Sequence, residues 1–354
     1  MSRIITFGEI MLRLKSPANE RLFQAPNLEA TFGGGEANVA VSLALFGREA
    51  AFVTALPDNP VADAAVRQLR GYGVDTRGIK RTKTGRLGIY FLETGANQRA
   101  STVVYDRDGS AIQAVKPGDF DWANLFAGAS WFHVTGITPA LSQSAADATL
   151  EAMKAAQKAG VKVSFDLNYR KKLWNYGKKA PEVMTELVKH VDVVVANEED
   201  IQMCLGINPD ASATGGVDVS TGHVSAEAYR GLTQKVKKTY PNLSVVAVTL
   251  RASRSADRNG WSAVLDGQAG FFTSKSYDID DIVDRVGGGD SFSAGLVFGL
   301  TEWADATTEH ESKALEYAVA ASCLKHSIPG DFNLVTRSEV ESLMGGDATG
   351  RVKR

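Results

Sequence analysis

The segment best suited to chemistry is a run of three glycines followed by an acid. The chain reads Asp284-Arg-Val-Gly-Gly-Gly-Asp290, and a helix is predicted to begin directly after it. Glycine lets backbone N–H groups turn toward a shared concavity, and the start of a helix adds the positive end of its dipole. We therefore expect the Asp290 carboxylate to lie beside an anion hole formed by Gly287, Gly288 and Gly289.

A carboxylate next to an anion hole suits phosphoryl transfer to a hydroxyl group. The carboxylate accepts the proton of the hydroxyl while the hole stabilises charge on the phosphoryl group. A simpler alternative is a glycine-rich turn in which Asp290 only caps a helix. The chain has no Gly-Lys-Ser/Thr in this segment and no Gly-x-Gly-x-x-Gly after its first predicted strand. P-loop NTPases and dinucleotide-dependent oxidoreductases are therefore disfavoured.

A second glycine run leads into a helix near the N-terminus. It reads Gly33-Gly-Gly-Glu-Ala-Asn38 and continues into small residues that allow close packing. Asn38 is the polar residue at the start of this helix, placed with Gly34 to meet a ligand hydroxyl. The alternative is a tightly packed helix that binds nothing.

The elements that must position these residues alternate between strands and helices. Short, continuous apolar runs are typical of buried parallel strands, and the runs between them have helical spacing. This order predicts an α/β fold with three layers, in which helices cover both faces of a mostly parallel central sheet. The predicted strands are 4–7, 51–55, 131–136, 161–166, 191–196 and 245–250. The predicted helices are 36–46, 60–71, 142–159, 181–190, 226–239, 291–300 and 312–325.

Two stretches break this alternation and read as strands without helices. Residues 10–30 and 86–114 are predicted to form a small β-sheet lid over the carboxyl ends of the parallel strands, where open α/β sheets bind ligands. The α/β domain would then comprise 1–9, 31–85 and 115–344, with 345–354 as a flexible tail. Because lid strands expose sheet edges, we expect a homo-oligomer that pairs through them.

The composition of the chain disfavours some classes of binding partner. The 354 residues include 39 Lys and Arg against 41 Asp and Glu, for a net charge of −2. This balance gives no basic field for nucleic acid. Two cysteines make no disulfide framework, and there is no signal-peptide-like start and no apolar run of about 20 residues. We expect a cytoplasmic protein with no membrane partner.

Together, the two glycine segments resemble the signatures of the PfkB family of carbohydrate kinases, which have the ribokinase-like fold. Both signatures are present in the expected order, and the resemblance covers nearly the whole chain. It implies that ATP and Mg²⁺ are used and that Asp290 is the catalytic base.

Further motifs resemble the 2-keto-3-deoxygluconate kinases within this family. They are Tyr90 with Tyr105-Asp-Arg107, Phe165-Asp-Leu-Asn-Tyr-Arg170, and Cys323-Leu-Lys-His-Ser-Ile-Pro-Gly-Asp-Phe332. A sugar acid carries a carboxylate, which guanidinium groups bind in a bidentate manner. We therefore expect Arg107 and Arg170 to bind that carboxylate, and Tyr90 and Tyr105 to shape the sugar pocket.

Each of these residues has a simpler alternative. Arg170 would be a surface residue in a basic cluster, and Arg107 would form a lid salt bridge to Asp106 or Asp108. Tyr90 and Tyr105 would be ordinary strand aromatics.

The resemblance also implies which residues contact the nucleotide. It implies an ATP and Mg²⁺ contact at Asn197, and a Mg²⁺ contact through water at Asp200, where relatives have the longer Glu. Thr249 is expected to contact ATP and lies in the predicted strand 245–250. Relatives have Gly directly after this strand, whereas this chain has Arg251, which suggests a phosphate contact by arginine. Other ATP contacts are expected from Gly287, Gly289 and, near the adenine, Gly330. The alternative for 197–200 is a charged helix start favoured by the dipole.

One more residue, Asp284, resembles a ligand of a monovalent cation such as K⁺ in relatives. The resemblance leaves open whether that ion binds this chain.

The expected activity is ATP-dependent phosphorylation of the 6-hydroxyl of 2-keto-3-deoxy-D-gluconate. Alternative acceptors are the galactonate epimer, fructose, ribose or a nucleoside. A sugar-acid sensor without catalysis is a more distant alternative, disfavoured because a sensor needs no base.

Overall fold

A large twisted sheet forms the centre of the molecule, and the computed structural model describes residues 3–209, 226–347 and 350. Its parallel part runs in the order β11, β10, β9, β8, β1, β4, β5, and an antiparallel part, β12 to β14, extends it beyond β11. The parallel strands are β1 (Arg3–Phe7), β4 (Glu49–Pro57), β5 (Ile79–Thr82), β8 (Ala129–Thr135), β9 (Lys162–Asp166), β10 (Val193–Ala196) and β11 (Val245–Ser253). The antiparallel strands are β12 (Asn259–Asp266), β13 (Phe271–Thr273) and β14 (Tyr277–Ile279).

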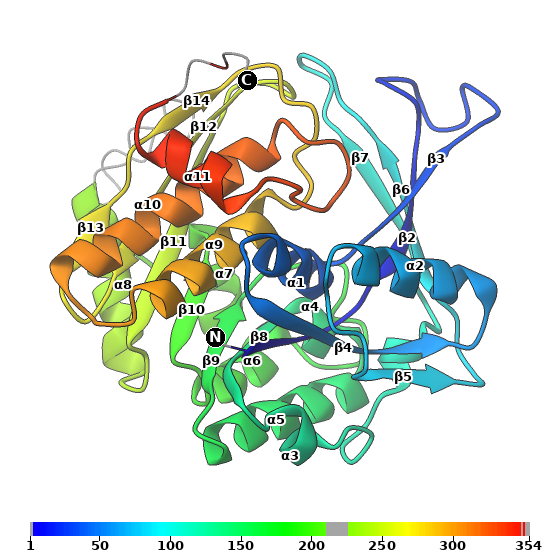
Figure 1. Ribbon diagram of the computed structural model, residues 1–354, viewed down its shortest axis with the longest axis horizontal. Coiled ribbons are helices and arrows are strands. Elements are labelled where there is room, and N and C mark those ends of the chain that lie inside the picture. Colours follow the sequence, from blue (N-terminus) through cyan, green and yellow to red (C-terminus); the bar gives the residue numbers. More distant parts are fainter. Residues whose placement is uncertain (1–2, 210–225, 348–349, 351–354) are drawn as a thin grey trace.

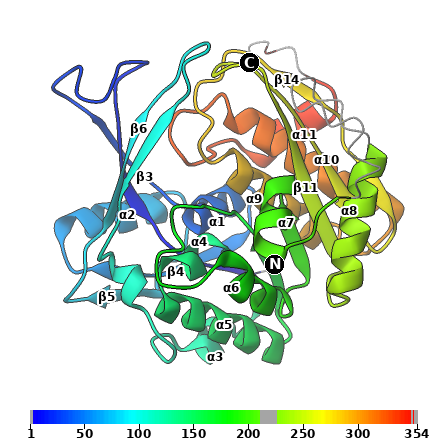
Figure 2. The ribbon, with the colours of Figure 1, turned by 180° about the vertical axis from the view of Figure 1, so that it is seen from behind.

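Helices cover both faces of this sheet, as Figures 1 and 2 show from opposite sides. One layer consists of α1 (Gly35–Leu45), α2 (Pro60–Gly71), α9 (Gly288–Glu302), α10 (Thr308–Lys325) and α11 (Arg337–Met344). The other contains the 3₁₀ turn η1 (Ala111–Ala114), α3 (Trp122–Leu125), α4 (Ile137–Leu141), α5 (Gln143–Lys158), α6 (Ala180–Val188), α7 (Glu198–Leu205) and α8 (Ala226–Thr239). Each layer packs its own apolar cluster against the sheet, which is why central strands such as β10 are buried along their whole length.

A second sheet projects from the body beside the carboxyl ends of the parallel strands (Figure 1). It has the order β3 (Glu29–Gly33), β2 (Met11–Lys15), β6 (Gly88–Glu93) and β7 (Thr102–Asp106). Strands β6 and β7 form an antiparallel hairpin, whereas β2 and β6 are parallel. We call this four-stranded sheet the lid sheet.

The predicted three-layer α/β architecture with a small second sheet is confirmed. The predicted strands and helices correspond to β1, β4, β8 to β11, α1, α2, α5, α6 and α8 to α10. The hairpin of β11 and β12 is a difference, because the predicted strand 245–250 ended three residues earlier and no strand was predicted directly after it. Instead β11 continues to Ser253 and pairs in antiparallel register with β12. The 3₁₀ turn η1, in the predicted lid segment, packs beside β4 and α5 of the body. Most of the predicted tail, 348–349 and 351–354, lies outside the described residues.

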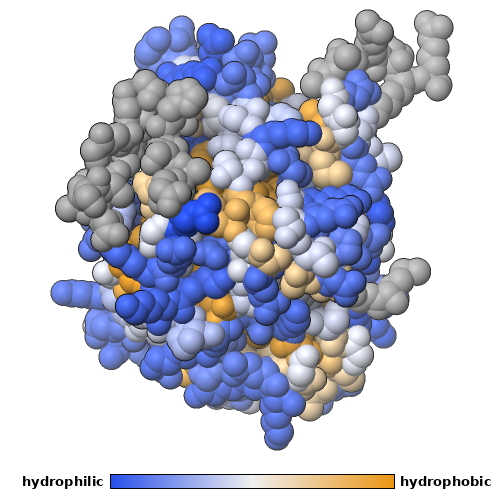
Figure 3. Space-filling view, turned by 90° about the vertical axis from the view of Figure 1, so that its left-hand side faces the viewer, coloured by the Kyte–Doolittle hydropathy of each residue, from blue (hydrophilic) through white to orange (hydrophobic). Residues whose placement is uncertain are grey.

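The face that carries α8, α10 and β13 is largely hydrophilic, with hydrophobic residues gathered in small areas between polar ones (Figure 3). Within the described ranges, no helix has the length and apolar character needed to cross a membrane.

Candidate active site

A cleft of about 1080 Å³ lies between the lid sheet and the carboxyl ends of the parallel strands. This volume is at the upper end of the range for small-molecule sites, and it has room for two ligands side by side. It is lined by 14 of the residues predicted from the sequence, which are Gly34, Asn38, Tyr90, Tyr105, Arg107, Arg170, Asn197, Asp200, Thr249, Arg251, Gly287, Gly288, Gly289 and Asp290. The fold therefore brings both glycine segments to one place.

The glycine run forms the start of α9 and has a backbone that requires glycine. Gly287 precedes the helix with φ at 84°, in the left-handed region. A Cβ atom built on it would lie 2.2 Å from the carbonyl oxygen of Asp331, so a side chain has no room. At Gly289 a Cβ would meet nothing within 4 Å, because this residue faces the cleft. Among the described residues no side chain caps α9; the N–H of Gly288 donates to the carbonyl oxygen of Arg285 at 3.3 Å, and Gly289, the next residue of the helix start, lines the cleft.

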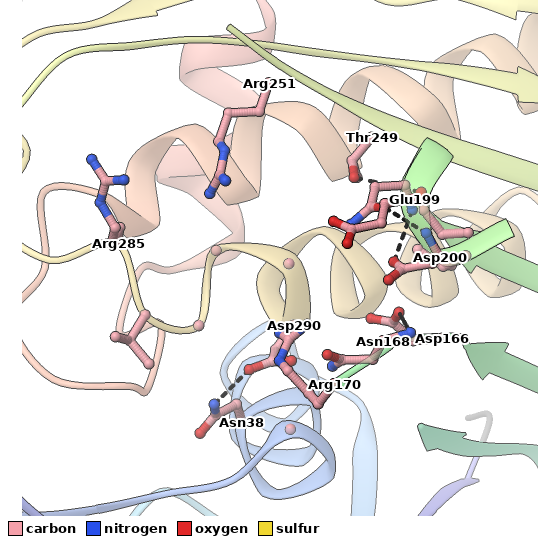
Figure 4. A pocket seen from close by; sticks show the side chains of 18 of the residues that line it. Asn38, Asp166, Asn168, Arg170, Glu199, Asp200, Thr249, Arg251, Arg285 and Asp290 are labelled. Atoms are coloured by element: carbon pink, nitrogen blue, oxygen red, sulfur yellow. Dashed lines mark hydrogen bonds between the residues drawn. The ribbon is translucent and has the colours of Figure 1, made fainter. Parts of the chain in front are cut away.

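Asp290 lies in the first turn of α9 and is held by the other glycine segment. The Nδ2 of Asn38 donates to the Asp290 carboxylate at 2.6 Å, and the N–H of Gly34 donates to Oδ1 of Asn38 at 3.2 Å (Figure 4). Asn38 therefore orients Asp290, and because Asn38 also lines the cleft, its expected contact with a ligand hydroxyl stays a prediction. A carboxylate fixed on one oxygen keeps the other available to a substrate proton.

Burial raises the pKa of Asp290 to about 6. The hydrogen bond from Asn38 opposes this shift, as do the positive charges of Arg170 and Lys325, whereas Asp331 reinforces it. A carboxylate with a pKa close to the working pH is better matched to accepting a proton than one with an ordinary pKa.

The side of the cleft next to the lid sheet carries an ion pair that the sequence did not indicate. Arg107 is buried and pairs with Glu9, not with Asp106 or Asp108 as the alternative supposed. Asp106 pairs with Arg86 instead. The second oxygen of Glu9, Oε1, is buried without a hydrogen-bond partner among the described residues and lines the cleft.

Two tyrosines of the lid sheet differ in exposure. The Tyr90 hydroxyl donates to Asp331 and the residue is buried, whereas Tyr105 is 44% exposed and stacks under the Arg107 guanidinium at 5.0 Å. Tyr90 therefore joins the lid sheet to the body, and Tyr105 offers a ring face to the cleft.

Arg170 lies at the centre of the cleft, close to Asp290 (Figure 4). Its charge lowers the pKa of Asp290 and opposes the raised pKa of the buried Asp166. The residue is exposed, and within the described part of the chain its guanidinium donates to the carbonyl oxygen of its neighbour Tyr169 at 2.8 Å. Its guanidinium is therefore open to a further anionic partner in the cleft.

Helix α7 begins on the opposite side of the cleft with a closed cap. The side chain of Asn197 accepts the N–H of Asp200 at 2.8 Å, and Asp200 accepts the N–H of Asn197 at 3.0 Å. The other oxygen of Asp200 accepts the N–H of Tyr169 at 2.9 Å. Both carboxylate oxygens of Asp200 thus bind the backbone, and the neighbouring Glu199 carboxylate is the one exposed to the cleft.

Two arginines line the cleft across from Thr249 and Glu199 (Figure 4). Arg251 lies on β11 and Arg285 lies just before the glycine run. Burial and the mutual proximity of positive charges lower the pKa of Arg251. A clustering of cations that already repel one another favours a bound polyanion.

Two predicted residues do not line this cleft. The Asp284 carboxylate is buried and paired with Arg13, and it also accepts the N–H groups of Val286 and Gly330, each at 3.1 Å. Gly330 therefore supports this contact and lies outside the cleft lining.

Sequence reasoning missed Glu9, Arg13, Asp166, Asp331 and Lys325. Arg13 and Asp331 are 318 positions apart, yet they form a buried ion pair at 2.6 Å. No local pattern marks such a pair. Asp166 lies inside the motif that ends at Arg170, and Lys325 and Asp331 lie inside the motif 323–332, so these three residues could have been flagged from the sequence. The described residues contain no group of three or more His, Cys, Asp or Glu side chains arranged to hold a metal.

Comparison with known proteins agrees with this geometry. Residues 1–333 match the pfkB family carbohydrate kinases. A 2-dehydro-3-deoxygalactonokinase of Haloferax volcanii is 32% identical over 98% of this chain and 98% of its own length. A 2-dehydro-3-deoxygluconokinase of Thermoproteus tenax is 27% identical over 97% of this chain and 94% of its own.

A solved structure shares the whole fold. The crystal structure of a 2-dehydro-3-deoxygluconokinase from Thermotoga maritima superposes with a TM-score of 0.89 and 45% identity, covering 98% of this chain and 100% of that chain. "2-Dehydro" and "2-keto" denote the same substituent. The chain belongs to the pfkB family of carbohydrate kinases.

Proposed function

We propose that this pfkB-family kinase transfers the terminal phosphoryl group of ATP to the 6-hydroxyl of a 2-keto-3-deoxy sugar acid, with the gluconate epimer as its main substrate. The observation that carries the proposal is the juxtaposition of an uncapped helix start, the Asp290 carboxylate and the exposed Arg170 guanidinium in one cleft. The three groups match the three charges involved, namely the phosphoryl group, the hydroxyl proton and the carboxylate.

In the proposed mechanism, the terminal phosphate lies against the N–H groups of Gly288 and Gly289, in line with the acceptor hydroxyl. Asp290, oriented by Asn38, accepts the hydroxyl proton as the oxygen–phosphorus bond forms and the bond to ADP breaks. The N–H groups of the α9 start stabilise charge on the phosphoryl oxygens. The lid sheet above the cleft limits access of water, which would otherwise be phosphorylated instead of the sugar.

The nucleotide side is proposed to hold ATP between Thr249, Arg251 and the start of α9. Mg²⁺, when bound with ATP, neutralises phosphate charge. Glu199 fits this ion because its carboxylate is exposed to the cleft, as does Asn197 at the rim. Asp200 would contribute only through water, because the backbone already occupies both of its oxygens.

The sugar acid is proposed to bind between Arg170 and the Glu9–Arg107 pair. Glu9 takes two nitrogen atoms of Arg107, so this arginine meets the substrate as part of an ion pair. Arg170 then supplies the main charge for the carboxylate. The Oε1 of Glu9, which has no hydrogen-bond partner among the described residues, is placed to accept a hydrogen bond from a sugar hydroxyl.

The test is a substrate comparison with purified protein. ADP release would be measured with 2-keto-3-deoxygluconate, 2-keto-3-deoxygalactonate, fructose, ribose and adenosine. We expect kcat/KM for either keto acid to exceed that for the neutral acceptors by more than about 10²-fold, as expected for a site that pairs a carboxylate. Preferential turnover of fructose or ribose would overturn the substrate class and leave the kinase assignment intact. Both keto acids belong in the test, because the relatives include a galactonate kinase.

Pairing of two copies through the lid sheet stays a prediction. Its edge strands are β3 and β7, and β7 carries Val104, which is 47% exposed. Light scattering on the wild type and on Val104→Lys would test it, since a charge on a paired edge strand disfavours the dimer.

A further inference from the structure

A buried lysine lies behind the anion hole and has no part in the mechanism above. Lys325 occupies the last turn of α10 and is fully buried, at 0% exposed. Its Nζ donates to the carbonyl oxygen of Ile328 at 3.0 Å and to that of Asp284 at 3.4 Å. Burying an ammonium group destabilises the folded protein unless the group is paired and hydrogen-bonded. The contacts that Lys325 makes are therefore expected to have a function.

The two carbonyls belong to the two loops that shape the start of α9. One loop leads from Asp284 to Gly287, and the other runs from His326 to Asp331. The N–H of Val283 donates to the carbonyl of His326 at 2.9 Å, and the backbone of Asp331 closes against Gly287. Lys325 therefore ties together the two loops whose contact sets the position of the glycine run.

The buried charges of Arg13, Asp284 and Asp331 behind the glycine run balance only when Lys325 is included. The carboxylates of Asp284 and Asp331 both bind the guanidinium of Arg13, which is 1% exposed and comes from the lid sheet. Two carboxylates with one guanidinium leave a negative charge close to the anion hole. The Lys325 ammonium cancels it, and a phosphate approaching Gly288 and Gly289 meets no net repulsion from behind.

The oxygen atoms around Asp284 do not fit the monovalent cation whose binding the resemblance of this residue implied. Both oxygens of the Asp284 carboxylate are taken, by Arg13 and by the N–H groups of Val286 and Gly330. The nearby carbonyls of Asp284 and Ile328 accept from Lys325. The ammonium thus holds the oxygen ligands that a K⁺ ion would need.

We propose that Lys325 is a positioning residue whose fixed ammonium supplies the charge and the loop-bridging contacts that a bound monovalent cation would supply, so that this kinase needs no such cation. The inference rests on the proposed role of the glycine run in binding the transferring phosphate. Burial lowers the pKa of Lys325 to about 8, while Asp284 and Asp331 oppose the shift, so the side chain is mainly charged at neutral pH.

The first arm of the test titrates the wild type with K⁺, replacing tetramethylammonium at constant ionic strength up to about 100 mM. Keto-acid turnover, the melting temperature and the affinity for ATP without sugar are all measured. We expect each rate or affinity to change by less than about twofold, and no saturable rise in melting temperature. A saturable increase in any of them would show that a cation binds and would overturn the proposal.

The second arm compares Lys325→Met with Lys237→Met. Lys237 is a control, because its Nζ also donates to a backbone carbonyl, that of Gly267, and in addition to the Asp266 carboxylate, but neither partner belongs to the two loops around the glycine run. We expect Lys325→Met to lower kcat and ATP affinity by about 10²-fold, as for a misplaced loop, with the KM for sugar nearly unchanged. Lys237→Met should retain both. An unchanged kcat and ATP affinity in Lys325→Met would overturn the proposal.

The two arms remain informative if other parts fail. If Lys325→Met does not fold, the wild-type titration still decides the question. If the wild type turns over no keto acid, the proposed function fails, while ATP affinity measured without sugar still tests Lys325.

Discussion

Helices α7 and α9 begin at the rim of the same cleft, and each has an aspartate at the third position of its first turn. In α7 the residue before the helix is Asn197, and Asp200 turns back to bind its N–H. In α9 the residue before the helix is Gly287, which offers no side chain, and Asp290 binds Asn38 of another helix. One helix start is satisfied by its own residues, whereas the other is open to a ligand. The residue before the helix, rather than the acid, distinguishes a cap from a site.

The largest effect is expected from Asp290→Asn, which tests whether the acid at the start of α9 acts as the base. The amide cannot accept the hydroxyl proton, so we expect kcat to fall by about 10³-fold or more. The melting temperature and the affinity for ATP should change little, which would be checked by thermal denaturation and calorimetry. A variant that retains a tenth of wild-type kcat would exclude Asp290 as the base.

The next largest effect is expected from Gly287→Ala. The backbone has φ at 84°, and a Cβ would lie 2.2 Å from the Asp331 carbonyl oxygen, so the start of α9 must move. We expect a loss in kcat of about 10²-fold. Gly206→Ala at the end of α7 is the control, because it also has a left-handed φ, of 67°, but has nothing within 4 Å of a Cβ. It should lose about 1 kcal/mol of stability and no activity.

Arg170→Met tests whether Arg170 binds the carboxylate of the substrate. Loss of a charge-assisted contact should raise the KM for the keto acid by about 10- to 100-fold, with a smaller effect on kcat. The same variant assayed with a neutral acceptor should show no comparable change in KM. Equal losses for charged and neutral acceptors would mean that Arg170 acts on the phosphate or on Asp290 instead.

The pH dependence should report Asp290. Its pKa is raised to about 6 by burial, and the base must be ionised, so kcat/KM should increase as pH rises through about 6 and then level off. Because Arg170 lowers the pKa of Asp290, Arg170→Met should move this limb to higher pH. A profile that is flat between pH 5 and 7 would contradict the assignment.

The smallest effect is expected at the closed helix start. Asp200→Asn weakens the cap of α7 and should cost about 1 kcal/mol of stability, measured by denaturant unfolding, with kcat within about threefold of wild type. Glu199→Gln is the matched comparison and should raise the Mg²⁺ concentration needed for half-maximal activity. The opposite pattern would make Asp200 the metal contact that the sequence suggested.

The sequence predicted the central sheet, most of its helices and the open start of α9, because each depends on local spacing. A glycine run before an amphipathic helix has few backbone solutions, and short apolar runs between helices read as parallel strands. The lid sheet followed from the two stretches, 10–30 and 86–114, that read as strands without helices.

The sequence could not predict partners that meet only in the folded chain. Arg13 and Tyr90 are register partners on neighbouring strands of the lid sheet, whereas Asp284 and Asp331 come from two loops of the body, and no local pattern marks the contact between them. Asn38 and Asp200 were also expected to contact ligands. In the folded chain, Asn38 binds the carboxylate of Asp290, and Asp200 binds the backbone of Asn197. A polar residue at a helix start predicts a hydrogen bond there, but not whether the partner is protein or substrate.

The most direct test of the account is a structure of the protein with a non-hydrolysable ATP analogue and 2-keto-3-deoxygluconate. We predict the terminal phosphate within hydrogen-bond distance of the N–H groups of Gly288 and Gly289, the 6-hydroxyl beside Asp290, and the carboxylate on Arg170. A terminal phosphate at the start of α7, or a sugar hydroxyl out of reach of Asp290, would contradict the central claim that the open start of α9 is the site of phosphoryl transfer.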